Sequence, residues 1–592
     1  MTTPTRLFDI PYLQLKQHKL SDAFVTKTNG KWVKTSTEEY ISKANTISRA
    51  LLRLGIAKNT KIAVISSNNR TDWSILDIGV LQVGAQNVPI YPTIGPEDYH
   101  FILTHSEAEY CFVSDQEIYD KLIQVKHDLP NIKEIYSFDE INGCKNWKEL
   151  FELGSDTSNQ AEVEQCMATI TSKDLATLIY TSGTTGKPKG VMLSHENILS
   201  NVIGSSERVP FNYEDNFRAL SFLPICHVFE RMIIYLYQYY SVSIYYAESI
   251  EKMTENLKEV KPQVMTVVPR LLEKVYDKIY ATGTQLTGIK KRIFFWAMDL
   301  GFAYEPYQKN GWWYEFKLGI AKKLIFSKWQ DALGGELKLL VSGSAALQSR
   351  LTRIFTAAGI PVMEGYGLTE TSPVIAVNDM RNHGFKIGTV GKPLSNIEVK
   401  IAEDGEIICK GPNVMMGYFK DPEKTQEEMK DGYFHTGDIG ILDEDGFLKI
   451  TDRKKEMFKT SGGKYVAPQM IENIMKQSRF IEQIMVIGEG EKMPAALIQP
   501  SFEFIKEWAS RKKLDIGKTD LEISTNAEVI KRIAQEVEKF NSQFGKWEQV
   551  KRFELTPDVW SIDNNQLTPT LKLRRKIIIQ MYQKLYDKIY RE

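Results

Sequence analysis

The first two thirds of the chain alternate short apolar runs with longer stretches in which apolar residues recur every three or four positions. The short runs are typical of buried strands, and the longer stretches have the spacing of amphipathic helices. We expect strands at residues 61–67, 87–93, 109–113, 175–180, 264–268 and 360–363, and helices at residues 35–54 and 73–84. This alternation predicts an α/β domain built of layered, mostly parallel sheets.

Later parts of the chain have a different pattern. Residues 388–437 contain short strand-like runs separated by Gly and Pro, which predicts a small antiparallel β subdomain. Roughly the last 120 residues alternate helix and strand signals and are expected to form a smaller α+β domain. Residues 138–172 are polar and acidic, and we expect an irregular connection there.

Composition narrows the class of protein. Lys plus Arg equals Asp plus Glu at 75 each, so no basic excess points to nucleic acid as a partner. The five cysteines are scattered without a C-x-x-C pair, which argues against a disulfide framework or a structural zinc site and fits a reducing cytosol. Residues 1–17 lack the layout of a signal peptide. The apolar stretch 232–247 is shorter than the ~20 residues of a spanning helix, so we expect a buried helix running into a strand.

The stretch YTSGTTGKPKG, residues 180–190, carries candidate chemistry. It holds three glycines, four Ser or Thr residues and two lysines between an apolar run and a helix start at Ser194. Bare backbone N–H groups, hydroxyl donors and cations together suit a polyphosphate. The spacing of Gly183, Gly186 and Lys187, followed by Pro188, excludes a Walker A loop. A flexible surface loop is the alternative for its composition alone.

The full string resembles the phosphate loop of the adenylate-forming superfamily, which includes acyl-CoA synthetases, luciferases and peptide-synthetase adenylation domains. SFLPICHVFERM, residues 221–232, is similar to the LPxxHxxER segment of long-chain acyl-CoA synthetases. The resemblance places His227 at the junction of acyl and nucleotide sites, where a neutral imidazole can donate to a carboxylate. A single buried histidine is the alternative. Glu230 and Arg231 are expected to form a local ion pair.

A second motif, GIPVMEGYGLTETSP, covers residues 359–373. An aromatic ring beside two glycines can cover a flat base, and a carboxylate next to a threonine can hold Mg²⁺. The resemblance implies that Tyr366 stacks on adenine, that Thr369 contacts the α-phosphate and that Glu370 binds Mg²⁺. The small-residue turn at Gly343 lets a ligand approach the backbone closely.

The C-terminal motifs also match the family. The resemblance assigns Asp438 and Arg453 to the ribose hydroxyls and Lys455 to the hinge of a mobile domain. NNQLTPTLKLRR, residues 564–575, is similar to the terminal lysine motif of long-chain synthetases and places Lys572 in the catalytic position. Other superfamily members have Gly before this lysine, where this chain has Leu571, which matches the long-chain branch.

The resemblance implies residues for catalysis, ATP binding, the acyl pocket and metal binding, and a division into two domains. The catalytic residues are Lys572, His227, Thr369 and Glu370. The ATP-binding residues are Thr181, Ser182, Gly183, Thr184, Thr185, Gly186, Lys187, Gly343, Ser344, Glu364, Gly365, Tyr366, Gly367, Thr369, Asp438, Arg453 and Lys572. The resemblance implies that His227, Val267, Val268 and Pro269 line the acyl pocket. For each of the last three, core packing is an equally strong alternative. The implied metal ligands are Thr181 and Glu370. The domains are 1–451 for adenylation, 452–456 as hinge and 457–592 as the mobile C-terminal domain.

Residues 288–330 combine aromatic residues with Lys and Arg, and two helical patterns flank the turn at residues 308–311. Basic residues beside bulky apolar ones are compatible with docking on an anionic membrane surface. They also suit a helical hairpin whose lysine stems pack on the domain while their charges reach solvent. We favour the hairpin and keep peripheral membrane contact as the alternative. An insertion here is similar to the long-chain branch of the family.

The resemblance implies a cytoplasmic long-chain fatty acid–CoA ligase that is AMP-forming and uses ATP, Mg²⁺ and CoA. Lys572 and Mg²⁺ would neutralise charge while carboxylate attacks the α-phosphorus. Rotation at Lys455 would then admit the CoA thiol, together with the SGGK loop at residues 461–464. The alternatives are a fatty acyl-AMP ligase that loads a carrier protein and a non-catalytic nucleotide- or lipid-binding protein. An oligomer is compatible with the sequence.

Overall fold

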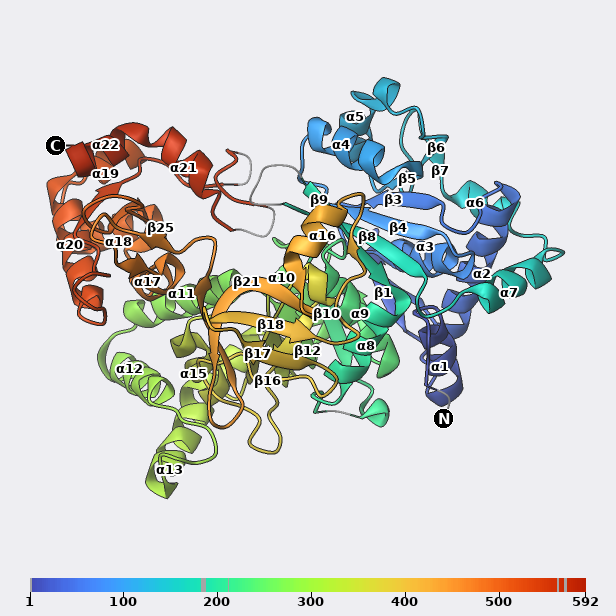
Figure 1. The fold of residues 1–592 in the computed structure, drawn as a ribbon. Coiled ribbons are helices and arrows are strands. Elements are labelled where there is room, and N and C mark those ends of the chain that lie inside the picture. Colours follow the sequence, from blue (N-terminus) through green and yellow to red (C-terminus); the bar gives the residue numbers. More distant parts are fainter. Residues whose placement is uncertain (1–2, 183–187, 211, 562–563, 569–571, 592) are drawn as a thin grey trace. The chain divides into compact units, whose positions relative to one another are not determined.

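The computed structural model describes residues 3–182, 188–210, 212–561, 564–568 and 572–591. It divides into two compact units (Figure 1). Unit 1 contains Met1–Lys400, Ile408–His435 and Asp443–Leu448, and unit 2 contains Ile401–Ile407, Thr436–Leu442 and Lys449–Glu592.

The first sheet of unit 1 has eight strands in the order β19-β9-β8-β4-β3-β5-β6-β7. The strands from β8 to β7 run parallel, whereas β9 and β19 are antiparallel to their neighbours. The bounds are β3 Lys61–Ile65, β4 Gln86–Ile90, β5 Ala108–Val113, β6 Glu134–Ser137, β7 Lys145–Asn146, β8 Leu175–Ser182, β9 Pro188–Ser194 and β19 Gly417–Tyr418.

The second sheet has nine strands in the order β16-β15-β14-β13-β12-β10-β11-β1-β2. Its central strands from β14 to β1 are parallel, and antiparallel strands close both edges. The bounds are β1 Phe24–Thr28, β2 Lys31–Thr35, β10 Arg218–Ser221, β11 Ser243–Tyr246, β12 Val264–Val267, β13 Leu339–Ser342, β14 Val362–Gly367, β15 Val374–Val377 and β16 Lys392–Pro393. The predicted class of layered, mostly parallel α/β sheets is therefore confirmed.

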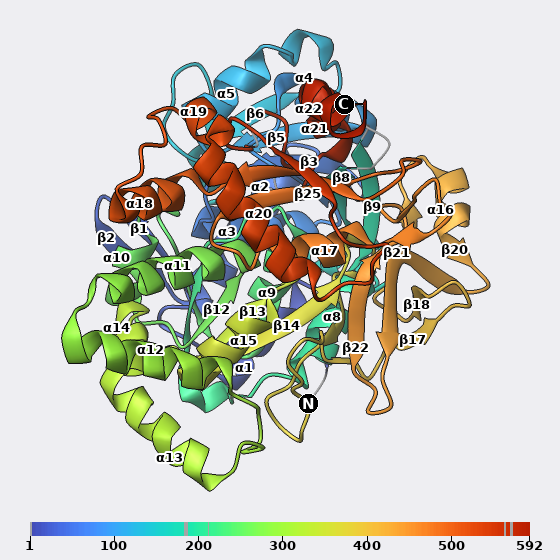
Figure 2. The ribbon, with the colours of Figure 1, turned by 90° about the vertical axis from the view of Figure 1, so that its left-hand side faces the viewer.

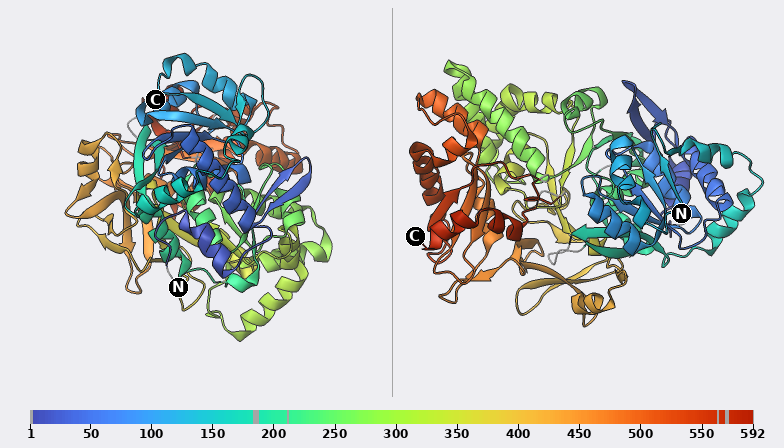
Figure 3. Two further views of the ribbon diagram at one scale, coloured as in Figure 1. Left: turned by 90° about the vertical axis from the view of Figure 1, so that its right-hand side faces the viewer. Right: turned by 90° about the horizontal axis from the view of Figure 1, so that it is seen from above.

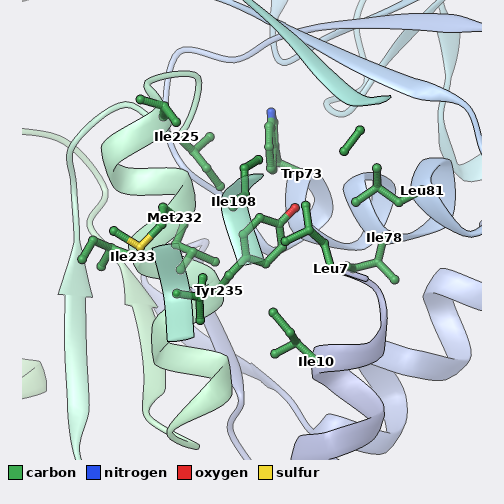
Figure 4. Packing of buried hydrophobic residues seen from close by; sticks show 14 of the residues in the cluster. Leu7, Ile10, Trp73, Ile78, Leu81, Ile198, Ile225, Met232, Ile233 and Tyr235 are labelled. Carbon is green, nitrogen blue, oxygen red and sulfur yellow. The ribbon is translucent and has the colours of Figure 1, made fainter. Parts of the chain in front are cut away.

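Helices of unit 1 cover these sheets and fill the space between them. One continuous apolar core contains residues of both sheets and of α3, α8 and α9. Figure 4 shows Ile78 of α3 and Tyr235 of α9 inside this core. The helices are α1 Asp9–Gln17, α2 Thr37–Arg53, α3 Thr71–Gln82, α4 Pro96–Ser106, α5 Gln116–Ile123, α6 Lys148–Leu153, α7 Gln160–Thr169, α8 His195–Ser206, α9 Val228–Tyr239, α10 Met253–Val260, α11 Pro269–Gln285, α12 Gly288–Phe302, α13 Trp312–Ala321, α14 Ser327–Ala332, α15 Ser349–Ala357 and α16 Pro422–Glu428.

Several sequence expectations can be compared directly with these elements. The stretch 232–247 is a buried helix, α9, followed by the strand β11, as predicted. Among the described residues, no helix has the length and apolar character needed to span a bilayer. The expectation of an irregular connection at 138–172 was wrong, because α6 and α7 lie there. These helices bury few apolar side chains, Leu150 and Val163 among them, so the apolar pattern is weak.

Residues 288–330 form the predicted helical hairpin. The helix α12 is followed by the turn and by α13, which continues through a π-helical turn, Lys322–Phe326, into α14. The helix α13 stands out from the rest of unit 1 in several views (Figures 1, 2 and 3). Phe294, Leu318 and Phe326 anchor the hairpin in the second apolar core of unit 1.

The predicted small antiparallel subdomain is a five-stranded sheet in the order β17-β18-β21-β20, with β22 paired to β21. The division between the two units passes through its strands. The bounds are β17 Glu398–Ile401, β18 Glu406–Lys410, β20 Met429–Lys430, β21 Tyr433–Leu442 and β22 Leu448–Arg453.

The remainder of unit 2 is an α+β domain, as expected. Its main sheet has the order β25-β26-β27, with β26 and β27 parallel, and β23 and β24 form a separate pair. Two apolar cores pack helices on this sheet. The elements are β23 Phe458–Lys459, β24 Tyr465–Val466, α17 Pro468–Met475, β25 Ile481–Ile487, β26 Ala495–Pro500, α18 Phe502–Lys512, α19 Asp520–Thr525, α20 Ala527–Asn541, β27 Arg552–Leu555, α21 Arg575–Met581 and α22 Gln583–Arg591.

A buried ion pair joins α3 to α9 in the core of unit 1. Arg231 Nη2 lies 2.5 Å from Asp77 Oδ1, and the two residues are 1% and 2% exposed. The guanidinium also donates to Thr177 Oγ1 of β8 at 2.7 Å, and Asn87 Nδ2 of β4 donates to Asp77 at 2.9 Å. The predicted local pair between Glu230 and Arg231 is wrong. Adjacent residues of a helix point about 100° apart, so the two side chains enter different surroundings.

Removing the carboxylate should strongly destabilise unit 1. Asp77→Asn leaves the buried Arg231 cation without its counter-charge, and we expect the free energy of unfolding to fall by about 3–5 kcal/mol. Urea unfolding measures the change. The matched control is Lys252→Gln, which removes an ion pair to Glu255 whose side chains are 55% and 53% exposed. It should leave the free energy of unfolding nearly unchanged, because water screens exposed charges. Equal costs for the two variants would contradict the assignment.

Candidate active site

Several predicted site residues of unit 1 lie at the carboxyl ends of strands in the nine-stranded sheet. The register of the parallel strands pairs Val267 of β12 with Ser342 of β13, and Ser342 with Glu364 of β14. These three strand ends therefore lie side by side at one level. Ligands of open α/β sheets bind outside this edge, because the loops that leave parallel strands meet there.

The loop after β13 lies against the start of α9. A Cβ on Gly343 would come within 3.1 Å of the Phe229 ring, so the close packing of the two segments favours glycine there. The N–H of Gly343 donates to the Val267 carbonyl at 3.3 Å. Ser344 adopts a left-handed φ of 69°, which turns the chain sharply away from the strand. Backbone of the predicted Gly343–Ser344 pair is thus fixed beside the helix that carries His227.

His227 occupies the N-cap of α9. The N–H of Phe229 donates to His227 Nδ1 at 3.1 Å, so in the neutral imidazole the proton is on Nε2. The ring is half-buried and lies edge-on to Tyr91, with the centroids 6.5 Å apart. Tyr91 follows β4 of the other sheet. Backbone geometry therefore selects the tautomer that can donate from Nε2.

A buried asparagine that the sequence did not reveal holds the loop leading to His227. Asn69 Nδ2 donates to the Leu223 carbonyl at 2.7 Å and to Ser221 Oγ at 2.9 Å. Its Oδ1 accepts the N–H of Ile225 at 3.0 Å. Asn69 follows β3 in a polar loop. Because Asn is common in turns, the sequence gives no sign of this role.

Glu230 lies in the core with two hydroxyl partners. Ser221 Oγ and Thr266 Oγ1 lie 2.5 and 2.6 Å from its carboxyl oxygens. Burial raises the pKa of Glu230 to about 7, against the lowering effect of these hydroxyls. Burial likewise raises the pKa of Glu364 to about 7, and Thr352 Oγ1 donates to its carboxyl at 2.7 Å. The side chain of the predicted ATP-binding residue Glu364 is thus already engaged within the domain.

The turn after β14 is held from several sides. The strand pairs with β15, so Gly365 and Tyr366 lie opposite Val377 and Ala376. A Cβ on Gly367 would lie 1.7 Å from the Pro373 carbonyl oxygen, so this position excludes any other residue.

A 3₁₀ turn, Thr369–Thr371, follows the strand. Asn413 Nδ2 donates to the Thr371 carbonyl at 3.0 Å, and the N–H of Met415 donates to the Glu370 carbonyl at 2.8 Å. Thr369 and Glu370 are thus presented on a rigid turn.

The carboxylate of Glu370 has a defined partner. Tyr418 Oη donates to Glu370 Oε1 at 2.9 Å, and burial, followed by the charge of Glu370, raises the pKa of that tyrosine. Lys189 Nζ lies 5.3 Å from the centre of the Tyr418 ring. Tyr418 belongs to β19, which pairs with β9, so the segment after the phosphate loop meets the predicted metal ligand. Groups of three or more acidic, His or Cys side chains suited to a metal do not occur among the described residues.

The phosphate loop joins two antiparallel strands. Thr181 and Ser182, at the end of β8, pair with Lys189 and Pro188 of β9. The sequence did not predict β9, and Ser194 caps α8 only after this strand, with a full capping box. Of the predicted ATP-binding residues, Gly183, Thr184, Thr185, Gly186 and Lys187 lie outside the described residues.

The three predicted acyl-pocket residues at the end of β12 differ in their surroundings. Val267 is 1% exposed and belongs to the second apolar core. Val268 is half-buried and packs against the first core, and Pro269 begins α11. Alternation along the strand therefore turns Val267 and Val268 to opposite sides.

Unit 2 brings the two predicted ribose residues together. Arg453 Nε donates to Asp438 Oδ1 at 3.1 Å across the neighbouring strands β22 and β21. The N–H of Asp438 donates to Thr436 Oγ1 at 3.1 Å. Asp438 is 5% exposed, so the carboxylate has a fixed orientation.

Lys572 is exposed and lies at one side of a narrow loop in unit 2. The N–H of Lys572 donates to Thr568 Oγ1 at 3.0 Å, and the N–H of Thr568 donates to the Lys572 carbonyl at 2.8 Å. Leu567 and Leu573 form an antiparallel bridge behind them. The predicted hinge residue Lys455 lies in an exposed turn directly after β22.

Two models of protein families match the chain. The model of the AMP-binding enzyme family matches residues 13–419, and the model of the AMP-binding enzyme C-terminal domain matches residues 456–592. The chain belongs to the AMP-binding enzyme family.

Relatives of this AMP-binding enzyme include several ligases. The long-chain-fatty-acid–CoA ligase FadD15 of Mycobacterium bovis is 33% identical over 95% of this chain and 93% of its own length. The long-chain-fatty-acid–CoA ligase 1 of Homo sapiens is 33% identical over 89% of this chain and 78% of its own length.

Solved structures share the fold. The adenylation domain of a carboxylate reductase from Mycobacterium chelonae has a TM-score of 0.74 at 18% identity, with 99% of this chain and 91% of that chain covered. A Mycobacterium tuberculosis fatty acyl CoA synthetase has a TM-score of 0.63 at 19% identity, with 98% of both chains covered.

Glu230 should make the stability of this AMP-binding enzyme depend on pH. Folding raises the pKa of this carboxyl from 4.5 to about 7, so its ionisation costs stability progressively as pH rises between these values. Glu230→Gln is neutral throughout and keeps hydrogen bonds to both hydroxyls. We expect the Tm of this variant relative to wild type to increase from pH 5 to pH 8. The control is Glu444→Gln, which alters an exposed carboxyl. If the Tm of Glu230→Gln ran parallel to that of wild type from pH 5 to pH 8, the assigned effect of Glu230 on stability would be refuted.

Proposed function

We propose that this AMP-binding enzyme is an AMP-forming long-chain fatty acid–CoA ligase. It converts a long-chain fatty acid and ATP to acyl-AMP and pyrophosphate, then transfers the acyl group to CoA and releases AMP. The observation that carries the proposal is the 33% identity to a long-chain-fatty-acid–CoA ligase over 95% of the chain. The arrangement of His227, Gly343 and the Thr369–Thr371 turn around one sheet edge supports it.

His227 orients the fatty acid in this proposal. Since Nδ1 accepts a backbone N–H, the imidazole can offer Nε2–H to a carboxylate oxygen of the substrate. A donor there stabilises the carboxylate and leaves its second oxygen to attack phosphorus. Val268 and Pro269 would line the acyl pocket, with Val267 supporting them from the core.

Several segments of the chain would supply the nucleotide contacts. The hydroxyl and N–H groups of residues 181–187 suit the β- and γ-phosphates, and Tyr366 suits the adenine face. Asp438 accepts ribose hydroxyls while Arg453 compensates its charge. Positioning and electrostatics supply most of the rate in phosphoryl transfer.

A magnesium ion fits Glu370 together with Thr181. Mg²⁺ is usually held by one or two carboxylates plus substrate phosphates, so a single well-oriented carboxylate meets the requirement. Tyr418 orients that carboxylate through its 2.9 Å hydrogen bond. The bound ion would neutralise charge on the triphosphate.

Two half-reactions require two arrangements of the C-terminal domain. During adenylation Lys572 neutralises charge on the reacting groups. Rotation at Lys455, in the hinge 452–456, then moves Lys572 away and admits the CoA thiol. The N-terminal domain would be 1–451 and the mobile domain 457–592, with residues 461–464 at the thiol site. If the enzyme instead loaded a carrier protein, mass spectrometry of a reaction with ATP and free CoA would find acyl-AMP but no acyl-CoA.

Lys572→Ala should separate the half-reactions. We expect pyrophosphate–ATP exchange with palmitate to fall by about 100-fold or more, because the variant lacks the cation that meets the two anions. Thioester formation from supplied palmitoyl-AMP should stay within about twofold, since the lysine is absent from that step. Lys576→Ala is the control, because Lys576 is an exposed lysine near the start of α21. Equal loss in both half-reactions would contradict this division, and ADP as the spent nucleotide would contradict the proposed function.

We further propose that α13 docks this cytoplasmic enzyme peripherally on anionic membrane surfaces, where long-chain fatty acids reside. Trp312, Phe316 and Ile320 recur every four residues along α13, and Leu324 follows in the π-helical turn after it. Their side chains are 78%, 56%, 38% and 49% exposed. Exposed Lys309, Lys322, Lys323 and Lys328 flank this stripe. Apolar side chains between lysines suit the headgroup boundary of an anionic bilayer.

Replacing the aromatic residues should weaken docking alone. We expect Trp312→Ser combined with Phe316→Ser to lower partitioning onto phosphatidylglycerol-containing vesicles by about tenfold or more, because roughly 1.5–3 kcal/mol is lost per buried side chain. Flotation assays measure partitioning, and activity in detergent should be unchanged. Leu521→Ser removes a side chain that is 60% exposed in unit 2 and serves as control. Undiminished flotation of the double variant would refute docking through α13.

A further inference from the structure

A network of charged side chains surrounds the first residue of α21. Arg575 Nη2 lies 2.7 Å from both carboxyl oxygens of Glu472, and its Nε donates to Glu456 Oε2 at 2.9 Å. Its Nη1 donates to the Val486 carbonyl at 3.2 Å. Every nitrogen of this guanidinium therefore has an acceptor.

The partners of Arg575 come from separate parts of unit 2. Glu472 belongs to α17 and Val486 to β25, which form the body of the domain. Glu456 directly follows Lys455, the predicted pivot. Arg575 itself lies three residues after Lys572. One side chain thus connects the domain body, the residue next to the pivot and the lysine-bearing loop.

The carboxylates of the network have further partners that fix their orientation. The N–H of Val486 donates to Glu472 Oε1 at 2.7 Å, and Gln469 Nε2 donates to Glu456 Oε2 at 3.0 Å. The side chains of Glu472 and Arg575 are 7% and 20% exposed. Screening by solvent is weak at such burial, so the ion pairs are stiff.

The chain on the other side of the pivot faces the same charges. Asp452 is 2% exposed, and burial raises its pKa to about 7, with Glu472 and Glu456 adding to the rise and Arg575 opposing it. Residues 452 and 456 bracket the predicted pivot. Both therefore respond to the charge of Arg575.

The position of Arg575 is transmitted to Lys572 through backbone. The N–H of Arg574 donates to the Gln566 carbonyl at 2.9 Å, Leu573 bridges Leu567, and Lys572 and Thr568 exchange two hydrogen bonds. Gln566 is fully buried and donates to Tyr582 Oη at 2.8 Å. These backbone contacts hold the base of the lysine loop rigidly and fix the backbone of Lys572 relative to it.

We propose that Arg575 is a positioning residue that locks the Lys572 loop to the segment after the pivot, so that rotation at Lys455 carries the lysine as a rigid lever. The inference rests on the proposed adenylation function. Locking the loop in this way requires a planar cation with several donors, because a lysine ammonium cannot bridge Glu472 and Glu456 with fixed geometry. The alternative is an ion pair that only stabilises the domain.

Arg575→Lys distinguishes the positioning role from mere stabilisation of the domain, because it keeps the positive charge and removes the forked guanidinium. We expect its kcat for pyrophosphate–ATP exchange with palmitate to fall between about tenfold and 100-fold with little change in KM for ATP, since a small misplacement of a reacting group is costly. Thioester formation from supplied palmitoyl-AMP should stay within about twofold. Arg532→Lys is the matched control, because it alters an arginine–carboxylate pair with Glu536 in α20, away from the lysine loop.

Hydrogen exchange of residues 564–574 supplies a readout that needs no activity. In Arg575→Lys these residues should exchange faster than in wild type, whereas β27, which has no part in the network, should exchange as in wild type. In Arg532→Lys, residues 564–574 should also exchange as in wild type. Unchanged exchange in this loop would overturn the inference, as would equal losses in both half-reactions or no loss in either. A wild-type enzyme that neither exchanges pyrophosphate nor forms acyl-CoA would overturn the proposed function instead, and hydrogen exchange would still decide the anchoring.

Discussion

The structure of unit 1 depends on the buried ion pair between Asp77 and Arg231. Two charges taken out of water must be compensated by close geometry and further hydrogen bonds, and here Thr177, Asn87 and Tyr235 supply them. These partners belong to α3, α9, β4 and β8. The network therefore admits one placement of α9 relative to the eight-stranded sheet. Close apolar packing and this directional network together fix the placement of the helix.

The candidate site follows from that placement. The carboxyl ends of parallel strands bring Val267, Ser342 and Glu364 to one level. The first turn of α9 then lies against the loop after β13, with the Phe229 ring where a side chain on residue 343 would be. Asn69 ties the loop before His227 to the other sheet. The imidazole is thus held by secondary structure from both sheets, although its own side chain is half exposed.

The local sequence pattern predicted most helices and strands, but few of the contacts between them. The periodicity of residues 232–247 identified a buried helix and strand, and Ser194 was recognised as a helix cap, because both signals lie within a few neighbouring residues. The strand β9 was missed because Pro188 and Gly190 weaken its pattern. Asn69 could not be found, since its partners lie more than 150 positions away. Its role is decided entirely by tertiary structure.

If His227 and Lys572 act as proposed, each unit holds a substrate-facing side chain in a similar way. A side chain that must meet substrate has to remain accessible, so burial cannot fix it. In each unit an arginine close along the chain is withdrawn from solvent instead, fully for Arg231 and largely for Arg575. Arg231 lies four residues after His227, and Arg575 three residues after Lys572. Each guanidinium engages a carboxylate from a separate segment at 2.5–2.7 Å. The rigid fork holds the backbone, and the backbone holds the accessible group. An arginine serves here better than an apolar anchor, because directional hydrogen bonds resist rotation as well as displacement.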